Sequence, residues 1–165
     1  MDMYKVMTVC TGNICRSPTG EFLLKDAAAR ADLPLQVASS GISNEERGNP
    51  IDRRAQKVLD ELGIDTTTHR AQQFNSQDFD RFDLILAMDT NHHQALKRLA
   101  PNDVAAAKVR LMREFDPAVA HQPLEDLGIY DPWYGNQEDF YETFEMIRAA
   151  VPGVLAYVEE ALESQ

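Results

Sequence analysis

Short apolar runs alternate with longer amphipathic stretches along the chain. The short runs have the composition and length of buried strands and cover residues 4–9, 35–38, 84–88 and 108–112. Stretches in which apolar residues recur at helical spacing separate them. Strands that alternate with helices are typical of a parallel sheet with helices on both faces. The pattern therefore predicts an α/β fold built on four parallel strands.

Local signals mark where the first helices begin and end. Ser17 is placed to cap the first helix, with Pro18 in its first turn. Asn49 is the expected cap of the second helix, with Pro50 at the first helical position. Gly63 should end that helix, because a glycine readily adopts the left-handed conformation that closes many helices.

The later helices follow from the remaining apolar spacing. Residues 91–99 predict a short helix that Pro101 ends. The last helix has an apolar stripe that stays in phase across Pro152, which predicts a kinked helix or two short coaxial ones. Acidic residues near its end are interpreted as a solvated face. The stripe consists of Phe140, Phe144, Ile147, Val151, Val154, Leu155, Val158 and Leu162.

Length, charge and cysteine content narrow the class of protein. The length fits one domain over residues 1–165. A net charge of −11 argues against nucleic acid and membrane surfaces as partners. The N-terminal apolar run is too short for a signal peptide, and no stretch is long enough to span a membrane. The only cysteines, Cys10 and Cys15, lie close together, which favours a reducing, cytoplasmic compartment.

Residues 10–18 have the composition of an anion-binding loop. They lie between the first strand and the first helix, at the edge of the sheet where α/β proteins bind ligands. Successive backbone N–H groups and the helix N-terminus attract a phosphate there. Gly12 allows a tight turn, Asn13 tolerates a left-handed conformation, and Arg16 can grip two phosphate oxygens. The sequence therefore predicts a phosphate-binding loop.

Cys10 and a late acidic residue supply the groups that hydrolysis would need. The positive surroundings favour the Cys10 thiolate, to which the Ser17 hydroxyl can donate a hydrogen bond. A general acid must protonate the leaving group, and the same residue can later activate water. Asp131 is the candidate, because it opens a rigid turn in which Trp133 and Tyr134 can wall a pocket. An ordinary Asp-Pro turn packed by aromatic residues is the alternative.

Separate segments of this chain together resemble the low-molecular-weight protein tyrosine phosphatases: residues 10–18, 88–89 and 131–135. The resemblance implies a single domain with a twisted parallel sheet. It also implies hydrolysis of phosphotyrosine in proteins, with inorganic phosphate as the product and without a metal or cofactor. Cys10 would be the nucleophile that forms a phosphocysteine, Arg16 the phosphate ligand, and Asp131 the general acid and then general base.

The resemblance also assigns residues that bind substrate or brace the loop. The substrate-binding positions are Thr11, Gly12, Asn13, Ile14, Cys15, Ser17, Glu45, Trp133 and Tyr134. A hydrogen-bond network of Asn13, Ser39 and His69 would brace the phosphate-binding loop. Ile14 stands where related arginine phosphatases have a threonine, which favours phosphotyrosine.

Further positions refine these expectations. Glu45 stands where relatives often present an aromatic wall, so the acidic loop around it should repel acidic peptides. Cys15 faces Cys10 as in members that form a reversible disulfide, and peroxide treatment of a Cys15→Ser variant tests this expectation. His92 and His93 are adjacent, cannot both face one metal ion, and are interpreted as solvated.

Other functions share parts of the pattern and stay as alternatives. An arsenate reductase has the same loop, but it needs further cysteines to pass a disulfide outward. A sugar-transport phosphocarrier also holds phosphate on a cysteine, yet it has no use for a general acid such as Asp131. A non-enzymatic phosphate-binding adaptor is the third alternative, since a fold does not fix a function.

Overall fold

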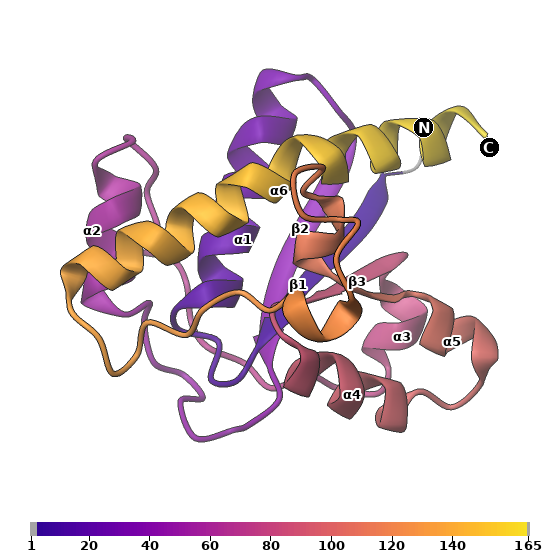
Figure 1. Cartoon of the computed structure of the whole chain (residues 1–165), viewed down its shortest axis with the longest axis horizontal. Coiled ribbons are helices and arrows are strands. Elements are labelled where there is room, and N and C mark those ends of the chain that lie inside the picture. The colour runs from indigo at the N-terminus through magenta and orange to yellow at the C-terminus, as the bar shows by residue number, and fades with distance from the viewer. Residues whose placement is uncertain (1–2, 165) are drawn as a thin grey trace.

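The strands of the sheet run parallel in the order β2-β1-β3-β4. The structure is a computed structural model that describes residues 3–164, and it confirms the predicted single-domain α/β fold (Figure 1). The strands are β1 (Tyr4–Cys10), β2 (Leu35–Gly41), β3 (Leu84–Ala87) and β4 (Val109–Leu111). The helices are α1 (Arg16–Arg30), α2 (Arg53–Asp60), α3 (Asp78–Arg81), α4 (Thr90–Leu99), α5 (Asp103–Ala107) and α6 (Gln137–Glu163), with 3-10 turns η1 (Met112–Phe115) and η2 (Leu124–Asp126).

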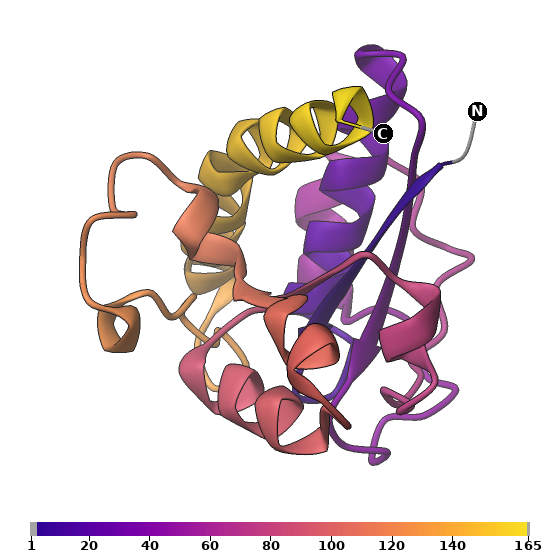
Figure 2. The same ribbon diagram turned by 90° about the vertical axis from the view of Figure 1, so that its right-hand side faces the viewer.

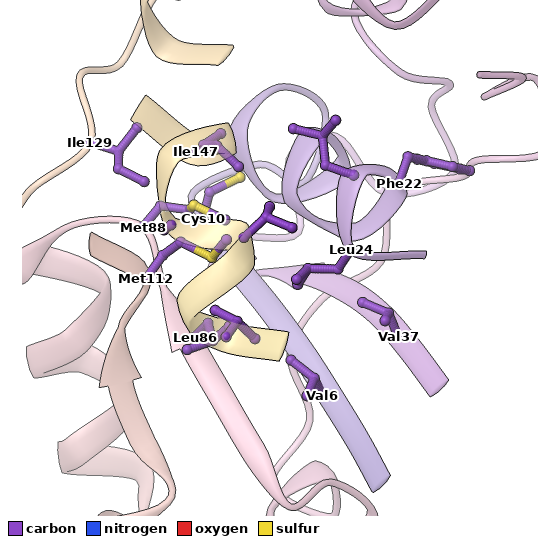
Figure 3. Packing of buried hydrophobic residues seen from close by; sticks show 14 of the residues in the cluster. Val6, Cys10, Phe22, Leu24, Val37, Leu86, Met88, Met112, Ile129 and Ile147 are labelled. Carbon is purple, nitrogen blue, oxygen red and sulfur yellow. The ribbon is translucent and has the colours of Figure 1, made fainter. Parts of the chain in front are cut away.

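Two hydrophobic cores lie on opposite faces of this sheet. Alternate residues of β1 enter different cores: Val6 belongs to the core with α1 and α6, whereas Met7 belongs to the core with α3, α4 and α5. Figure 2 shows α1 and α6 on one side of the sheet and the shorter helices on the other. Figure 3 shows the first core, which includes Leu24 of α1, Ile147 of α6 and Leu86 of β3. Burial on both faces explains why the strands are continuous apolar runs rather than alternating ones.

The helix starts differ from two of the sequence predictions. Ser17 does not cap α1: it lies inside the first turn, and its hydroxyl oxygen is 3.0 Å from Cys10 Sγ. Asn49 does not cap α2 either. The cap is Asp52, whose carboxylate accepts a hydrogen bond from the Arg54 backbone N–H at 2.8 Å. Residues 49–52 form no helix, because the Asn49 carbonyl, which a cap would give to the first helical hydrogen bond, accepts the Ala71 N–H at 2.8 Å.

The predicted helix ends are confirmed. Gly63 has a φ of +74°, its N–H bonds to Asp60 O at 2.9 Å, and the Ile64 N–H reaches back to Leu59 O at 3.1 Å. Of the two options for the last helix, the structure shows one continuous helix, α6, with Pro152 inside it. No helix within residues 3–164 offers a stretch that is both long and apolar enough to cross a membrane.

The carboxyl edge of the sheet holds the loop that follows β1. Ile42 N–H donates to Cys10 O at 2.9 Å and Ser43 N–H donates to Thr11 O at 3.0 Å, so the segment after β2 runs alongside this loop. Gly41 makes the close approach possible, because a Cβ at this position would lie 2.6 Å from Thr11 O. The sheet therefore fixes the position of the predicted phosphate-binding loop.

Candidate active site

A cavity of about 210 Å³ opens over the loop between β1 and α1. Three separate segments line it: the loop itself, the segment after β2, and the segment before α6. The lining residues are Cys10, Thr11, Gly12, Ile14, Cys15, Arg16, Ser43, Glu45, Glu46, Asp131, Trp133 and Tyr134. The structure thus brings together the residues predicted for nucleophile, phosphate ligand, general acid and pocket walls, although they are far apart in the sequence.

Cys10 ends β1 at the floor of this cavity and is only 3% exposed. The Ser17 hydroxyl oxygen lies 3.0 Å from its sulfur, within hydrogen-bond distance. Asn13 adopts a φ of +61°, the left-handed conformation that the sequence analysis expected it to tolerate. Because α1 begins at Arg16, the loop leads directly into a helix N-terminus, whose N–H groups and dipole favour an anion in front of it.

The Asn13 side chain connects the loop to its surroundings. Its Nδ2 donates to Ser17 Oγ at 2.8 Å and to Ser39 Oγ at 2.9 Å, and its Oδ1 accepts from the Gln72 N–H at 2.9 Å. The Asn13 carbonyl oxygen lies 2.7 Å from His69 Nε2. The predicted trio of Asn13, Ser39 and His69 therefore does lie in one network, and all three residues are buried.

A buried carboxylate, Glu21, determines whether Ser39 donates or accepts at each of its hydrogen bonds in this network. Glu21 Oε1 accepts a hydrogen bond from Ser39 Oγ at 2.5 Å. Since a hydroxyl has one proton, Ser39 must then accept rather than donate at its contact with Asn13. Asn13 also donates to Ser17 Oγ, so the single Ser17 proton has two possible acceptors, the Cys10 sulfur at 3.0 Å and the Ser40 carbonyl oxygen at 3.2 Å. Glu21 was not predicted from the sequence, because nothing local distinguishes it from other helical glutamates.

Arg16 is the only guanidinium among the cavity-lining residues, and it is 3% exposed. One terminal nitrogen donates to Asp89 Oδ2 at 2.8 Å and to the Ile129 carbonyl at 3.0 Å. The other lies 3.5 Å from Asp131 Oδ2. Burial raises the pKa of Asp89, but His92 and Arg16 outweigh it and hold that pKa below its ordinary value. Asp89 is therefore an anion, and it holds the Arg16 guanidinium in position.

His92 contradicts the interpretation that it is solvated. The residue is 4% exposed, and its Nε2 lies 2.8 Å from Thr11 Oγ1 in the phosphate-binding loop. Burial lowers the pKa of His92 to about 4, against the opposing effect of Asp89. The contact spans 81 positions in sequence, so the adjacent histidine pair gave no local signal for it. His93 is half-buried and does not line the cavity.

Asp131 lies at the mouth of the cavity with 48% of its side chain exposed. Its Oδ1 accepts the Trp133 N–H at 3.1 Å, and Gly135 N–H closes the turn onto Pro132 O at 2.9 Å. Trp133 is 40% exposed and Tyr134 is 95% exposed. The predicted turn therefore presents a solvent-accessible carboxyl group beside open aromatic side chains.

Glu45 and Glu46, in the segment after β2, form an acidic lip of the cavity. Glu45 is exposed, and Glu46 accepts a hydrogen bond from Asn49 Nδ2 at 2.6 Å. Glu46 also packs over Gly12, where a Cβ would lie 3.1 Å from the Glu46 Cγ. Among residues 3–164, no cluster of three or more His, Cys, Asp or Glu side chains is arranged to hold a metal ion.

Cys15 lies on the wall of the cavity as a free, buried thiol, as does Cys10 at its floor. Burial raises the pKa of Cys15, and the carboxylate of Asp52 raises it further. Cys15 is therefore a neutral thiol at neutral pH, with no role as a competing thiolate. Ile14 is 9% exposed and offers an apolar surface to the cavity.

The fold and this arrangement define an α/β protein with a cysteine at the floor of a cavity, between the first strand and the N-terminus of the first helix. The sequence pattern of the family described as low molecular weight phosphotyrosine protein phosphatase matches residues 5–164. The low molecular weight protein-tyrosine-phosphatase of Streptomyces coelicolor is 43% identical over 98% of both chains. The chain therefore belongs to the low molecular weight phosphotyrosine protein phosphatase family.

A further relative and two solved structures support this family assignment. Low molecular weight protein-tyrosine phosphatase A of Mycobacterium tuberculosis is 39% identical over 98% of this chain and 95% of its own. A protein tyrosine phosphatase of Entamoeba histolytica, solved with Hepes in its active site, superposes with a TM-score of 0.87 at 27% identity, covering 96% of this chain and 98% of its own. Wzb of Vibrio vulnificus, solved with benzylphosphonate, gives a TM-score of 0.77 at 32% identity, covering 96% and 99%.

We predict that His92 makes the fold sensitive to acid. Its pKa is 6.5 when exposed and about 4 in the fold, so between these values only the unfolded chain binds the proton. The stability it contributes is complete above pH 6.5 and is lost as the pH falls towards 4. The full shift of the His92 pKa, from 6.5 to about 4, corresponds to about 3 kcal/mol in the free energy of unfolding.

Urea unfolding at a series of pH values measures this effect. In a His92→Gln variant, the free energy of unfolding should decline less between pH 6.5 and 4 than in the wild type. His121→Gln is the matched control, because His121 is exposed and should keep the wild-type slope. An unchanged slope in His92→Gln would contradict the prediction.

Proposed function

We propose that this protein is a protein tyrosine phosphatase that works through a phosphocysteine on Cys10. The observation that carries the proposal is Cys10 at the floor of the cavity, with the Ser17 hydroxyl 3.0 Å from its sulfur and a helix N-terminus in front. Family membership supports it, since the relatives are named for this activity. A thiolate stabilised in this way is the nucleophile that covalent phosphate transfer requires.

Arg16 is the proposed phosphate ligand. Its contacts with Asp89 and Ile129 use both protons of one terminal nitrogen. Nε and the other terminal nitrogen keep their protons for two phosphate oxygens, which is the bidentate geometry that favours arginine at such sites. The 3.5 Å separation from Asp131 is too long for a hydrogen bond, so a bound phosphate can take this nitrogen without breaking one.

Asp131 is the proposed general acid and base. In the first step the Cys10 sulfur bonds to phosphorus, the bond to the aryl oxygen breaks, and protonated Asp131 gives its proton to that oxygen. In the second step the Asp131 carboxylate takes a proton from water, which attacks phosphorus, breaks the phosphorus–sulfur bond and restores the thiolate. Its 48% exposed side chain gives water and leaving group access to the carboxyl group.

The shape of the cavity supports phosphotyrosine as the substrate. Ile14, Trp133 and Tyr134 offer apolar and aromatic surfaces above the phosphate-binding loop. The partners that we propose are therefore phosphotyrosine-containing proteins, with inorganic phosphate as the product. A cytoplasmic location and a reversible Cys10–Cys15 disulfide stay predictions from the sequence and the resemblance.

Hydrolysis of para-nitrophenyl phosphate at mildly acid pH, with EDTA present, tests the proposed nucleophile. The wild type should turn over, and Cys10→Ser should lose turnover because a serine hydroxyl is not ionised there. The variant should still bind inorganic phosphate, since the backbone N–H groups and Arg16 remain. Near-normal turnover by Cys10→Ser would exclude Cys10. A folded, reduced wild type without turnover would favour the phosphocarrier or adaptor alternatives.

The leaving group tests the role of Asp131. Asp131→Asn should lower kcat/KM for phenyl phosphate by about 10²–10⁴-fold, the usual contribution of a general acid. The loss should be much smaller for nitrophenyl phosphate, because its leaving group needs little protonation. Aryl phosphates with leaving groups of graded acidity measure the difference. Equal losses across the series would count against Asp131 as the proton donor.

The acidic lip predicts a preference among peptides. Glu45 and Glu46 line the cavity, whereas the neighbouring Arg47 does not, so basic residues beside the phosphotyrosine should improve kcat/KM over acidic ones by about fivefold at low salt. The Glu45→Gln, Glu46→Gln double variant should reduce this preference. Paired phosphopeptides that differ only in flanking charge measure it. The same ratio in both proteins would show that the lip does not select substrates.

A further inference from the structure

Arg54 joins the turn that carries Asp131 to the rest of the site. It lies in the first turn of α2, and every side-chain donor nitrogen has an acceptor. Nε and one terminal nitrogen bond to the two oxygens of Asp52, at 3.2 and 3.0 Å. The other terminal nitrogen donates to the carbonyl oxygens of Trp133 and Gly135, at 3.2 Å each. One planar group thus bridges α2 and the turn.

Further contacts fix the orientation of this guanidinium. Its central carbon lies 4.3 Å from the ring centre of Phe140 and 5.6 Å from that of Trp133, which is the range of cation–π attraction. Gln137 Nε2 donates to the Arg54 carbonyl oxygen at 3.0 Å. Arg54 is therefore held by the first turns of α6 as well as by the turn that precedes it.

The Asp52 end of this arrangement is anchored to the phosphate-binding loop. Asp52 N–H donates to the Ile14 carbonyl oxygen at 2.9 Å, while its carboxylate caps α2. The Asp52 side chain is only 10% exposed, so its charge requires the Arg54 partner. Hydrogen bonds therefore lead without a gap from Ile14, through Asp52 and Arg54, to Trp133.

The Trp133 end reaches the proposed general acid. The Trp133 N–H donates to Asp131 Oδ1 at 3.1 Å, and the carbonyl of the same residue accepts from Arg54. Asp131 is otherwise largely exposed, and its other oxygen is 3.5 Å from Arg16. The position of the carboxyl group therefore depends on the position of the turn, which Arg54 holds through two carbonyl oxygens.

We propose that Arg54 is a positioning residue for Asp131, which it holds at a fixed distance from the phosphate-binding loop. This inference rests on the proposed function, because it assumes that Asp131 transfers the proton. A catalytic group displaced by about 1 Å can cost about 10²-fold in rate. A lysine cannot replace Arg54, since a single ammonium cannot serve a carboxylate and two carbonyl oxygens in one plane.

The test is a double-mutant cycle on kcat/KM with two leaving groups. Arg54→Ala should lower kcat/KM for phenyl phosphate by about 10- to 100-fold, and by less than about threefold for nitrophenyl phosphate. In an Asp131→Asn background, Arg54→Ala should cost less than about threefold for phenyl phosphate, because the group it positions is already inactive. Arg54→Lys should fall between wild type and Arg54→Ala.

Controls separate this role from a structural one. Arg53→Ala removes the neighbouring charge, which is exposed, and should leave both substrates unaffected. Inhibition by inorganic phosphate should stay within about twofold in Arg54→Ala and Arg54→Lys, because the phosphate-binding loop itself is intact. Thermal unfolding shows whether each variant is folded, and Arg54→Lys serves as the readout if Arg54→Ala is not.

Equal losses for both leaving groups, or full additivity with Asp131→Asn, would overturn the inference. A weaker inhibition by phosphate that matches the loss of rate would also overturn it, because Arg54 would then act through Asp52 on the phosphate-binding loop. A wild type that hydrolyses neither substrate would instead refute the proposed function. The two failures are therefore distinguishable in one set of measurements.

Discussion

Asn13 is the residue on which the shape of the phosphate-binding loop depends. Its side chain is fully buried, and it is bonded to α1 through Ser17, to β2 through Ser39 and to the segment after α2 through Gln72. Buried polar groups are costly when unpaired, so these bonds must form together or the loop changes shape. The loop is therefore set by the folded core and not by a ligand, as electrostatic preorganisation requires.

The charge of the molecule makes this local organisation necessary. A chain with a net charge of −11 repels a phosphate dianion at long range. In the proposed function, attraction comes from the few groups that face the anion: the N–H groups at the start of α1, and Arg16. Carboxylates nevertheless surround the cavity at Glu45, Glu46 and Asp131. In the function that we propose, these carboxylates act at the mouth, where substrates differ, while the floor binds the phosphate that all substrates share.

How much the sequence predicts depends on how local each signal is. The strands and the Cys10–Arg16 spacing were predictable, because buried runs and a strand–loop–helix junction need only neighbouring residues. The cap at Asn49 was wrong, because the Asn49 carbonyl pairs with the distant Ala71 N–H and α2 is capped by Asp52 instead. The buried position of His92 was not predictable, because burial at the loop depends on how α4 packs against the sheet. Arg54 was missed because its contacts likewise depend on packing between distant segments, here α2 and the turn before α6.

Arg16 shows why two carboxylates with different exposure are needed beside one cation. Asp89 is the less exposed of the two, at 22% of its side chain, and its bond to Arg16 at 2.8 Å orients the guanidinium. Asp131 is 48% exposed and 3.5 Å from Arg16, so it stays available for the proton transfer that we propose. A charged His92 would compete with Arg16 for Asp89, and burial prevents this by keeping the imidazole neutral. Arg16, which lines the cavity, is then the cation that Asp89 orients.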